Sequence, residues 1–165
     1  CLLGSINLSA FVRDPFSEHS YFDFDGLKAC VKAAVKALNE VLDEGLPLHP
    51  LEEQRESVRQ WRQIGLGIMG LADALIKLGL TYGEEEAVAM CHRIGFAMAD
   101  TAIAASALLA KEEGAYPMCN IRQVMETPYF QANTTEKTRE LVKKYGLRNS
   151  QLLTCLLYTS PSPRD

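Results

Sequence analysis

The chain begins Cys1-Leu-Leu-Gly-Ser-Ile-Asn-Leu8, and this stretch decides how the fold is interpreted. Successive side chains of a strand point to opposite faces, so a strand here has two different faces. One face is apolar, and the other offers a thiol, a hydroxyl and an amide. The apolar face consists of Leu2, Gly4, Ile6 and Leu8, and the polar face of Cys1, Leu3, Ser5 and Asn7. We therefore predict an N-terminal strand whose polar face is able to support chemistry.

Most of the remaining chain follows the helical period instead. Apolar residues recur at i, i+4 and i+7, and glycines close several of these stripes. The pattern predicts helices over 27–45, 51–63, 64–79, 84–113, 120–126 and 135–145, a loop over 9–26 and a second short strand over 151–154. The sequence thus indicates an α/β fragment that is itself predominantly α-helical with an N-terminal strand.

The composition is that of an ordinary globular domain. Of 165 residues, 47% are hydrophobic and 23% charged, and 17 Lys and Arg against 21 Asp and Glu leave a net charge of -4. This balance offers no basic footprint for nucleic acid or for a membrane surface. From the apolar stretches and the N-terminal residues we expect neither a transmembrane helix nor a signal peptide. Because the chain lacks an initiator Met, we expect a fragment of a longer protein.

The cysteines favour neither a disulfide framework nor a metal centre. There are five, an odd number, and neither they nor the three histidines show the paired short spacing of zinc ligands. We therefore expect no metal site and a reducing, cytoplasmic location. Cys30 and Cys91 lie on or beside helical apolar stripes and are expected in the core, whereas Cys119 is expected in a loop.

One glycine motif has two interpretations. Gly65-Leu-Gly67-Ile-Met-Gly70 fits G-x-G-x-x-G, and the acidic run Glu84–Glu86 follows where a ribose-binding carboxylate would fall. A nicotinamide or flavin dinucleotide site needs a hydrophobic strand leading into the glycines, and the preceding Val58–Gln63 is too polar for one. We favour glycines inside a helix that packs closely on a neighbour, with the dinucleotide-binding oxidoreductase as the alternative.

Two charged clusters are expected to lie on solvated helix faces. Arg59, Trp61 and Arg62 form the first, and an anion or stacking site is its less favoured interpretation. Glu84–Glu86 forms the second, where acidic residues suit the positive end of a helix dipole.

Four segments in order resemble the catalytic (large, alpha) subunits of ribonucleotide reductases. The strand of residues 1–8 is similar to the family's Cys-x-Leu-Gly-Ser-Ile-Asn-Leu strand. The other three are the Arg-x-x-Gly-x-Gly-x-x-Gly segment over 62–70, the helix end Lys111–Pro117, and Arg148–Thr154, which resembles the approach to a phosphate loop. The resemblance covers about residues 1–154, which we take as a partial barrel domain.

The resemblance implies part of a ten-stranded α/β barrel that reduces ribonucleotides to 2′-deoxyribonucleotides by thiyl-radical chemistry, as a ribonucleoside-diphosphate reductase does for DNA replication. It makes Cys1 one of two cysteines that become a redox-active disulfide in each turnover. Ser5 and Asn7 would lie beside the substrate. The radical cysteine and the second redox cysteine would precede this segment, so the isolated piece is expected to be inactive.

The same resemblance implies the partners and cofactors of the complete enzyme. These are a ribonucleoside di- or triphosphate, a thioredoxin- or glutaredoxin-type reductant, and nucleotide effectors bound elsewhere in the full chain. The radical source is expected to be adenosylcobalamin, or else a radical-generating metal subunit in trans, with no cofactor bound by this segment alone.

After Thr154 the sequence departs from the family. Residues 155–165 have the composition of an unrelated tail, and Cys155 is not expected to match a shuttle cysteine of the family. A non-enzymatic helical interaction module, in which Cys1 is incidental, is the second alternative.

Overall fold

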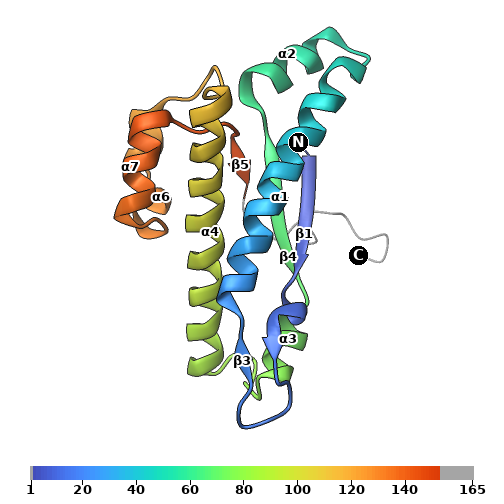
Figure 1. The fold of residues 1–165 in the computed structure, drawn as a ribbon, viewed down its shortest axis with the longest axis vertical. Coiled ribbons are helices and arrows are strands. Elements are labelled where there is room, and N and C mark those ends of the chain that lie inside the picture. The colour runs from blue at the N-terminus through green and yellow to red at the C-terminus, as the bar shows by residue number, and fades with distance from the viewer. Residues whose placement is uncertain (1, 153–165) are drawn as a thin grey trace.

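The computed structural model describes residues 2–152 of the chain, which contain a small parallel sheet. Its strands are β1 (Leu2–Asn7), β4 (Ile64–Met69) and β5 (Gln151–Leu152), in the order β1-β4-β5 (Figure 1). Both pairings are parallel. β4 is the central strand, and both of its neighbours are remote from it in sequence. The N-terminal strand is confirmed, and the described part of the second predicted strand is confirmed as β5.

Helices connect the strands and make up most of the described chain. The predicted helices over 27–45, 51–63, 84–113, 120–126 and 135–145 are confirmed with small shifts at their ends. The helices are α1 (Phe24–Gly45), α2 (Glu52–Trp61), α3 (Leu71–Lys77), α4 (Glu85–Glu113), α5 (Ile121–Glu126), α6 (Pro128–Ala132) and α7 (Glu136–Tyr145), with 3-10 turns η1 (Leu8–Phe11) and η2 (Leu46–Leu48). The sequence did not predict α6.

The loop expected over 9–26 contains regular structure. It holds η1 and a two-stranded antiparallel ribbon of β2 (Val12–Arg13) and β3 (Tyr21–Phe22). At its end Asp23 caps α1, since its carboxylate accepts the backbone N–H of Gly26 at 2.8 Å. Two-residue strands are too short to produce a recognisable alternation in the sequence.

The main core lies between the sheet and the helices α1 and α4. Leu27, Val31 and Val35 of α1 are almost fully buried against it, because their spacing places them on one stripe of the helix. From the sheet, Ile6, Ile64 and Leu66 complete the same cluster. The apolar stripe that predicted α1 is therefore the surface that positions β1.

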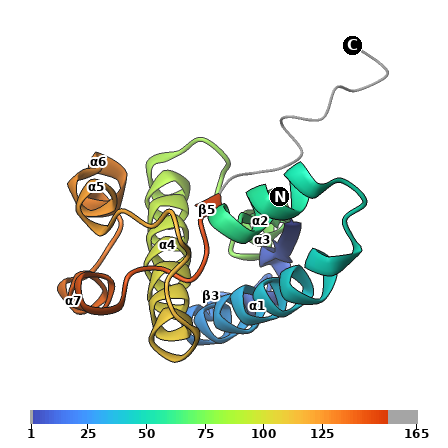
Figure 2. The same cartoon turned by 90° about the horizontal axis from the view of Figure 1, so that it is seen from above.

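A second, smaller core lies on the other side of α4. In both views α4 stands between the sheet and the group α5–α7 (Figures 1 and 2). Ile103 and Ala107 of α4 pack there with Phe130 of α6 and Val142 of α7. Because α4 has partners on two sides, it is apolar over an unusually wide surface.

This wide apolar surface corrects one sequence expectation. By length and composition alone α4 could cross a membrane, although no stretch was expected to qualify. Most of that stretch is buried inside the protein, where both cores contact it. Its apolar character is accounted for by its position between the two cores.

The prediction of a helix over 64–79 is wrong for its first half. Residues 64–69 form β4, and only Leu71–Lys77 form a helix, α3. A strand that neighbours cover on both faces reads as a continuous apolar run, so the period of two disappears. The spacing of Ile64, Ile68 and Leu71 then matches a helical stripe by coincidence.

Candidate functional site

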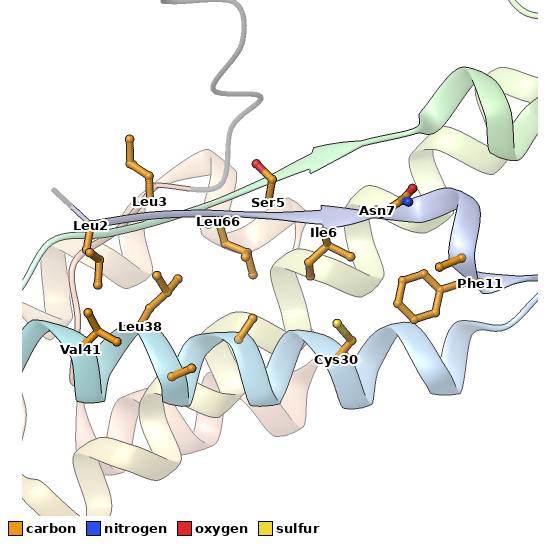
Figure 3. A pocket seen from close by; sticks show the side chains of 14 residues that line it. Leu2, Leu3, Ser5, Ile6, Asn7, Phe11, Cys30, Leu38, Val41 and Leu66 are labelled. Atoms are coloured by element: carbon orange, nitrogen blue, oxygen red, sulfur yellow. The ribbon is translucent and has the colours of Figure 1, made fainter.

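The two faces predicted for the N-terminal strand are present in β1. Leu2 and Ile6 point toward α1, while Leu3, Ser5 and Asn7 point away from it (Figure 3). The side chains of the second group are exposed, and Ile6 is buried. Cys1 itself lies outside the described residues, so its assignment stays a prediction.

Beside Ser5 the sheet carries glycine instead of a side chain. In the parallel register Leu3 pairs with Gly65, Ser5 with Gly67, and Asn7 with Met69. Partners in neighbouring strands point to the same face, so Gly65 and Gly67 lie on the face of Ser5. Both glycines are buried, and β4 therefore places no side chain beside Ser5 on this face.

Asn7 has a structural role at the end of β1. Its side-chain oxygen accepts the N–H of Ser9 at 3.1 Å and so caps η1. Gly70 takes a left-handed conformation next to it, with φ of 69°, and a Cβ there would collide with the Asn7 oxygen. Ser5, by contrast, is exposed on the same face.

On the opposite face of β1 an apolar groove runs along α1. It has a volume of about 570 Å³ and is lined by Ile6, Cys30, Leu38 and Val41 among others (Figure 3). The expectation that Cys30 lies in the core is only half correct, because its thiol is partly exposed in this groove. Cys30 thus lies behind the strand that carries Ser5.

The two other described cysteines are also partly exposed. Cys91 lies on the outer side of α4, beside His92, instead of in the core as expected. Cys119 follows α4 in a loop, as expected, and packs at the edge of the second core near Tyr116. Neither thiol is near the polar face of β1.

The dinucleotide interpretation of Gly65–Gly70 fails on geometry. Such a site needs its glycines in the turn between a strand and a helix, where backbone N–H groups face the phosphates. Gly65 and Gly67 instead lie inside β4, paired with β1 on one side and, for Gly65, with β5 on the other. Only Gly70 is in the turn, and the helix after it is seven residues long. The hydrophobic strand judged missing is thus the glycine segment itself.

Arg62 is buried, although the sequence placed it on a solvated helix face. It ends α2 in a left-handed conformation, with φ of 44°, and is 5% exposed. Its guanidinium binds both carboxylate oxygens of Asp43 at 2.7 Å and the side-chain oxygen of Asn39 at 2.8 Å. A buried arginine needs a charged partner, and for Arg62 this partner is Asp43, which lies in another helix and could not be read from the local sequence.

Further polar residues are hydrogen-bonded to Arg62 and its partners, near the first residues of β4 and β5. Asn149 donates to the side-chain oxygen of Asn39 at 3.2 Å and to the carbonyl of Arg62 at 3.3 Å. Asn39 in turn donates to Glu113 at 3.2 Å, and Glu113 also pairs with Arg148. We call these residues, together with Asp43, the entrance cluster, because they meet where β4 and β5 begin. Sequence reasoning missed the cluster, since its members come from four separate segments.

The other residues of the two predicted charged clusters lie on solvated surfaces, as expected. Arg59 is exposed and pairs with Glu56 at 2.8 Å, one helical turn away. The side chain of Trp61 is 39% exposed and lies 6.4 Å from the ring of Tyr116. Glu85 and Glu86 lie in the first turn of α4.

A parallel sheet with helices between its strands defines an α/β protein, and comparison with known sequences makes the class specific. The family model "Ribonucleotide reductase, barrel domain" matches residues 1–156. The chain therefore belongs to the ribonucleotide reductase barrel family.

Named relatives agree with this assignment. The ribonucleoside-diphosphate reductase subunit alpha of Chlamydia pneumoniae is 33% identical over 174 residues, covering 93% of this chain and 16% of the relative. The vitamin B12-dependent ribonucleoside-diphosphate reductase of Mycobacterium tuberculosis (strain ATCC 25618 / H37Rv) is 40% identical over 117 residues, covering 71% of this chain and 16% of the relative. The large chain from Neurospora crassa is 32% identical, covering 93% of this chain. The chain spans 16% to 17% of the length of these relatives.

Proposed function

We propose that this chain is part of a ribonucleotide reductase catalytic subunit that reduces ribonucleoside diphosphates to 2′-deoxyribonucleotides. The observation that carries the proposal is the polar face of β1, where Ser5 is exposed beside a glycine of β4. The alternation of the sequence predicts that Cys1 shares that face. In this proposal residues 1–154 are one partial barrel domain, and residues 155–165 do not belong to it.

Cys1 serves as one half of a reducing dithiol in this proposal. Two thiols lose two electrons and form a disulfide, the 2′-hydroxyl leaves as water, and a hydrogen takes its place on the ribose carbon. The second thiol and the radical cysteine come from parts of the enzyme outside this segment. A thioredoxin- or glutaredoxin-type protein then reduces the disulfide by exchange, since a thiolate attacks it and forms a mixed disulfide.

A strand is a suitable support for such a thiol. Reacting groups must be held within about 0.5 Å of a productive geometry, and strands position side chains more precisely than loops do. The side chains of Ile6 on β1 and Leu66 on β4 fix the back of the sheet against α1. On the other face Gly67 of β4 places no side chain beside Ser5. For Asn7 the capping bond to Ser9 favours a structural role over substrate contact.

The radical source belongs to the complete enzyme. Among residues 2–152 no group of three metal-ligating side chains is arranged to hold a metal ion. Adenosylcobalamin, which the name of the Mycobacterium relative suggests, would supply the initiating radical when bound. We propose this cofactor over a metal subunit in trans. Nucleotide effectors elsewhere in the chain and a cytoplasmic location complete the proposal.

Replacing Cys1 tests the proposal directly. Cys1→Ser in the complete enzyme should abolish multiple turnover with a dithiol reductant, because a hydroxyl cannot form a disulfide. Cys30→Ser is the matched control, since this thiol lies on the other side of the same strand. It should cost about 1–3 kcal/mol of stability and leave turnover per folded molecule unchanged. Steady-state deoxynucleotide formation by Cys1→Ser at the parental rate would refute the redox role.

A further inference from the structure

Three backbone hydrogen bonds fix where the strands of the sheet begin. The N–H of Leu2 donates to the carbonyl of Gln63 at 3.3 Å, and the N–H of Ile64 donates to the carbonyl of Ser150 at 3.0 Å. The N–H of Ser150 donates to the carbonyl of Trp61 at 3.3 Å. Two of these bonds involve Trp61 or Gln63, the residues that flank Arg62, and the third involves Ile64, the first residue of β4. The conformation of Arg62 consequently sets how β4 meets both of its neighbours.

Arg62 is held at this point from two directions. Its guanidinium is fixed on α1 by Asp43 and Asn39, and its own carbonyl accepts the side chain of Asn149. These contacts offset the unfavourable left-handed backbone of a residue that is not glycine. A lysine would have one charged nitrogen in place of the planar fork, so it could not reproduce the paired bonds to Asp43 together with the bond to Asn39.

The register set in this way determines what lies beside Ser5. In the observed register Ser5 faces Gly67, and Leu66 and Ile68 belong to the opposite face. A slip of one residue would turn every side chain of β4 to the other face. Either Leu66 or Ile68 would then stand beside Ser5 in place of the glycine. The proposed chemistry therefore depends on the register of β4.

We infer that Arg62, acting through β4, is a positioning residue that keeps the glycine face of the sheet beside Ser5, on the face that the proposed function assigns to Cys1. This inference rests on the proposed function and adds a residue that does not itself contact the substrate. Asn39 and Asp43 support Arg62 from α1, and Asn149 links it to the start of β5. The entrance cluster thus determines which residues of β4 lie on the face where the reaction takes place.

The test compares Arg62→Lys with Arg59→Lys in the complete reductase. Arg59 is the matched control, because it lies on the same helix and its ion pair is exposed. Arg62→Lys should lower kcat at least about tenfold per folded molecule, since small misplacements of reacting groups cost up to about 100-fold. KM should change less than about threefold, and Arg59→Lys should match the parent. A kcat for folded Arg62→Lys within a factor of two of the parent overturns the inference.

Hydrogen exchange provides a second readout that does not depend on activity. The amides of Ile64 and Ser150 should exchange faster in Arg62→Lys and remain unchanged in Arg59→Lys. Unchanged exchange at both amides also overturns the inference. If the parent enzyme forms no deoxynucleotide, the proposed function fails, and the exchange result alone then decides whether Arg62 fixes the register.

Asp43→Asn covers the case in which Arg62→Lys does not fold. Its side chain is 41% exposed, so the neutral amide can be accommodated. Asp43→Asn weakens the bonds to the Arg62 guanidinium without removing all of them, and we expect a smaller loss of kcat than in Arg62→Lys. Parental kcat and parental exchange at Ile64 in this variant would contradict the inference.

Discussion

Ser106→Ala should loosen the segment that leads into β5, although alanine is the better helix former. Ser106 lies in α4 with no exposed surface, and its hydroxyl oxygen accepts the backbone N–H groups of Arg148 and Asn149, both at 3.1 Å. The N–H of Arg148 has a second acceptor in the carbonyl of Ser106, at 3.2 Å. The buried N–H of Asn149 would lose its acceptor, at a cost of about 1–3 kcal/mol.

The expected loss of stability in Ser106→Ala follows from the lost hydrogen bond and the helix propensity of alanine. The higher helix propensity of alanine offsets at most about 0.5 kcal/mol, so the net destabilisation is about 1.5 kcal/mol. That corresponds to a roughly tenfold change in the local opening equilibrium, because about 1.4 kcal/mol is a factor of ten. Hydrogen exchange over residues 147–152 of the complete enzyme measures this opening. Ser57→Ala, at an exposed position of α2, is the control and should leave exchange unchanged. An acceleration of exchange below about threefold in Ser106→Ala would show that the Ser106 hydroxyl does not hold the segment leading into β5.

Two further predictions concern backbone strain and pH. Gly70→Ala should cost about 1–2 kcal/mol or more in urea unfolding, since it forces a side chain into the left-handed region against Asn7, whereas Gly45→Ala, with open space around it, should be neutral or stabilising. Burial, with a smaller contribution from Cys119, raises the pKa of Tyr116 to about 12. The folded state therefore keeps this proton longer than the unfolded state, so the stability it contributes is complete below about pH 10 and is lost as pH rises toward 12. Tyr116→Phe should remove that alkaline loss, and an identical pH dependence in the variant would exclude the assignment.

The long helices could be predicted from the sequence for a clear reason. α1 buries one stripe, and Leu27, Val31 and Val35 show it at the helical spacing. α7 has a polar exposed side and a cap at Thr135, which accepts the N–H of Thr138. Where an element has one apolar and one polar side, the periodicity of the sequence records its burial directly. The alternation of β1 was readable for the same reason.

β4 and Arg62 could not be predicted in this way. Residues 64–67 of β4 are all buried, so its burial gives no contrast between the two faces, and its glycines were the remaining signal. Two glycines within Ile64–Met69 disfavour a helix by about 1 kcal/mol each, which outweighs the coincidence of apolar spacing. The burial of Arg62 depends on Asp43 and Asn149, which are distant in the sequence, and no local pattern contains that information.

In the proposed function Cys1 is oxidised during the reduction of a ribonucleotide. The most direct measurement is a single turnover of the complete, prereduced enzyme without external reductant, followed by alkylation and peptide mass spectrometry. We expect the Cys1 peptide to be recovered in a disulfide in proportion to the deoxynucleotide formed, while Cys30 is recovered alkylated. Product formed in stoichiometric amount with Cys1 still fully alkylated would contradict the proposed role of Cys1.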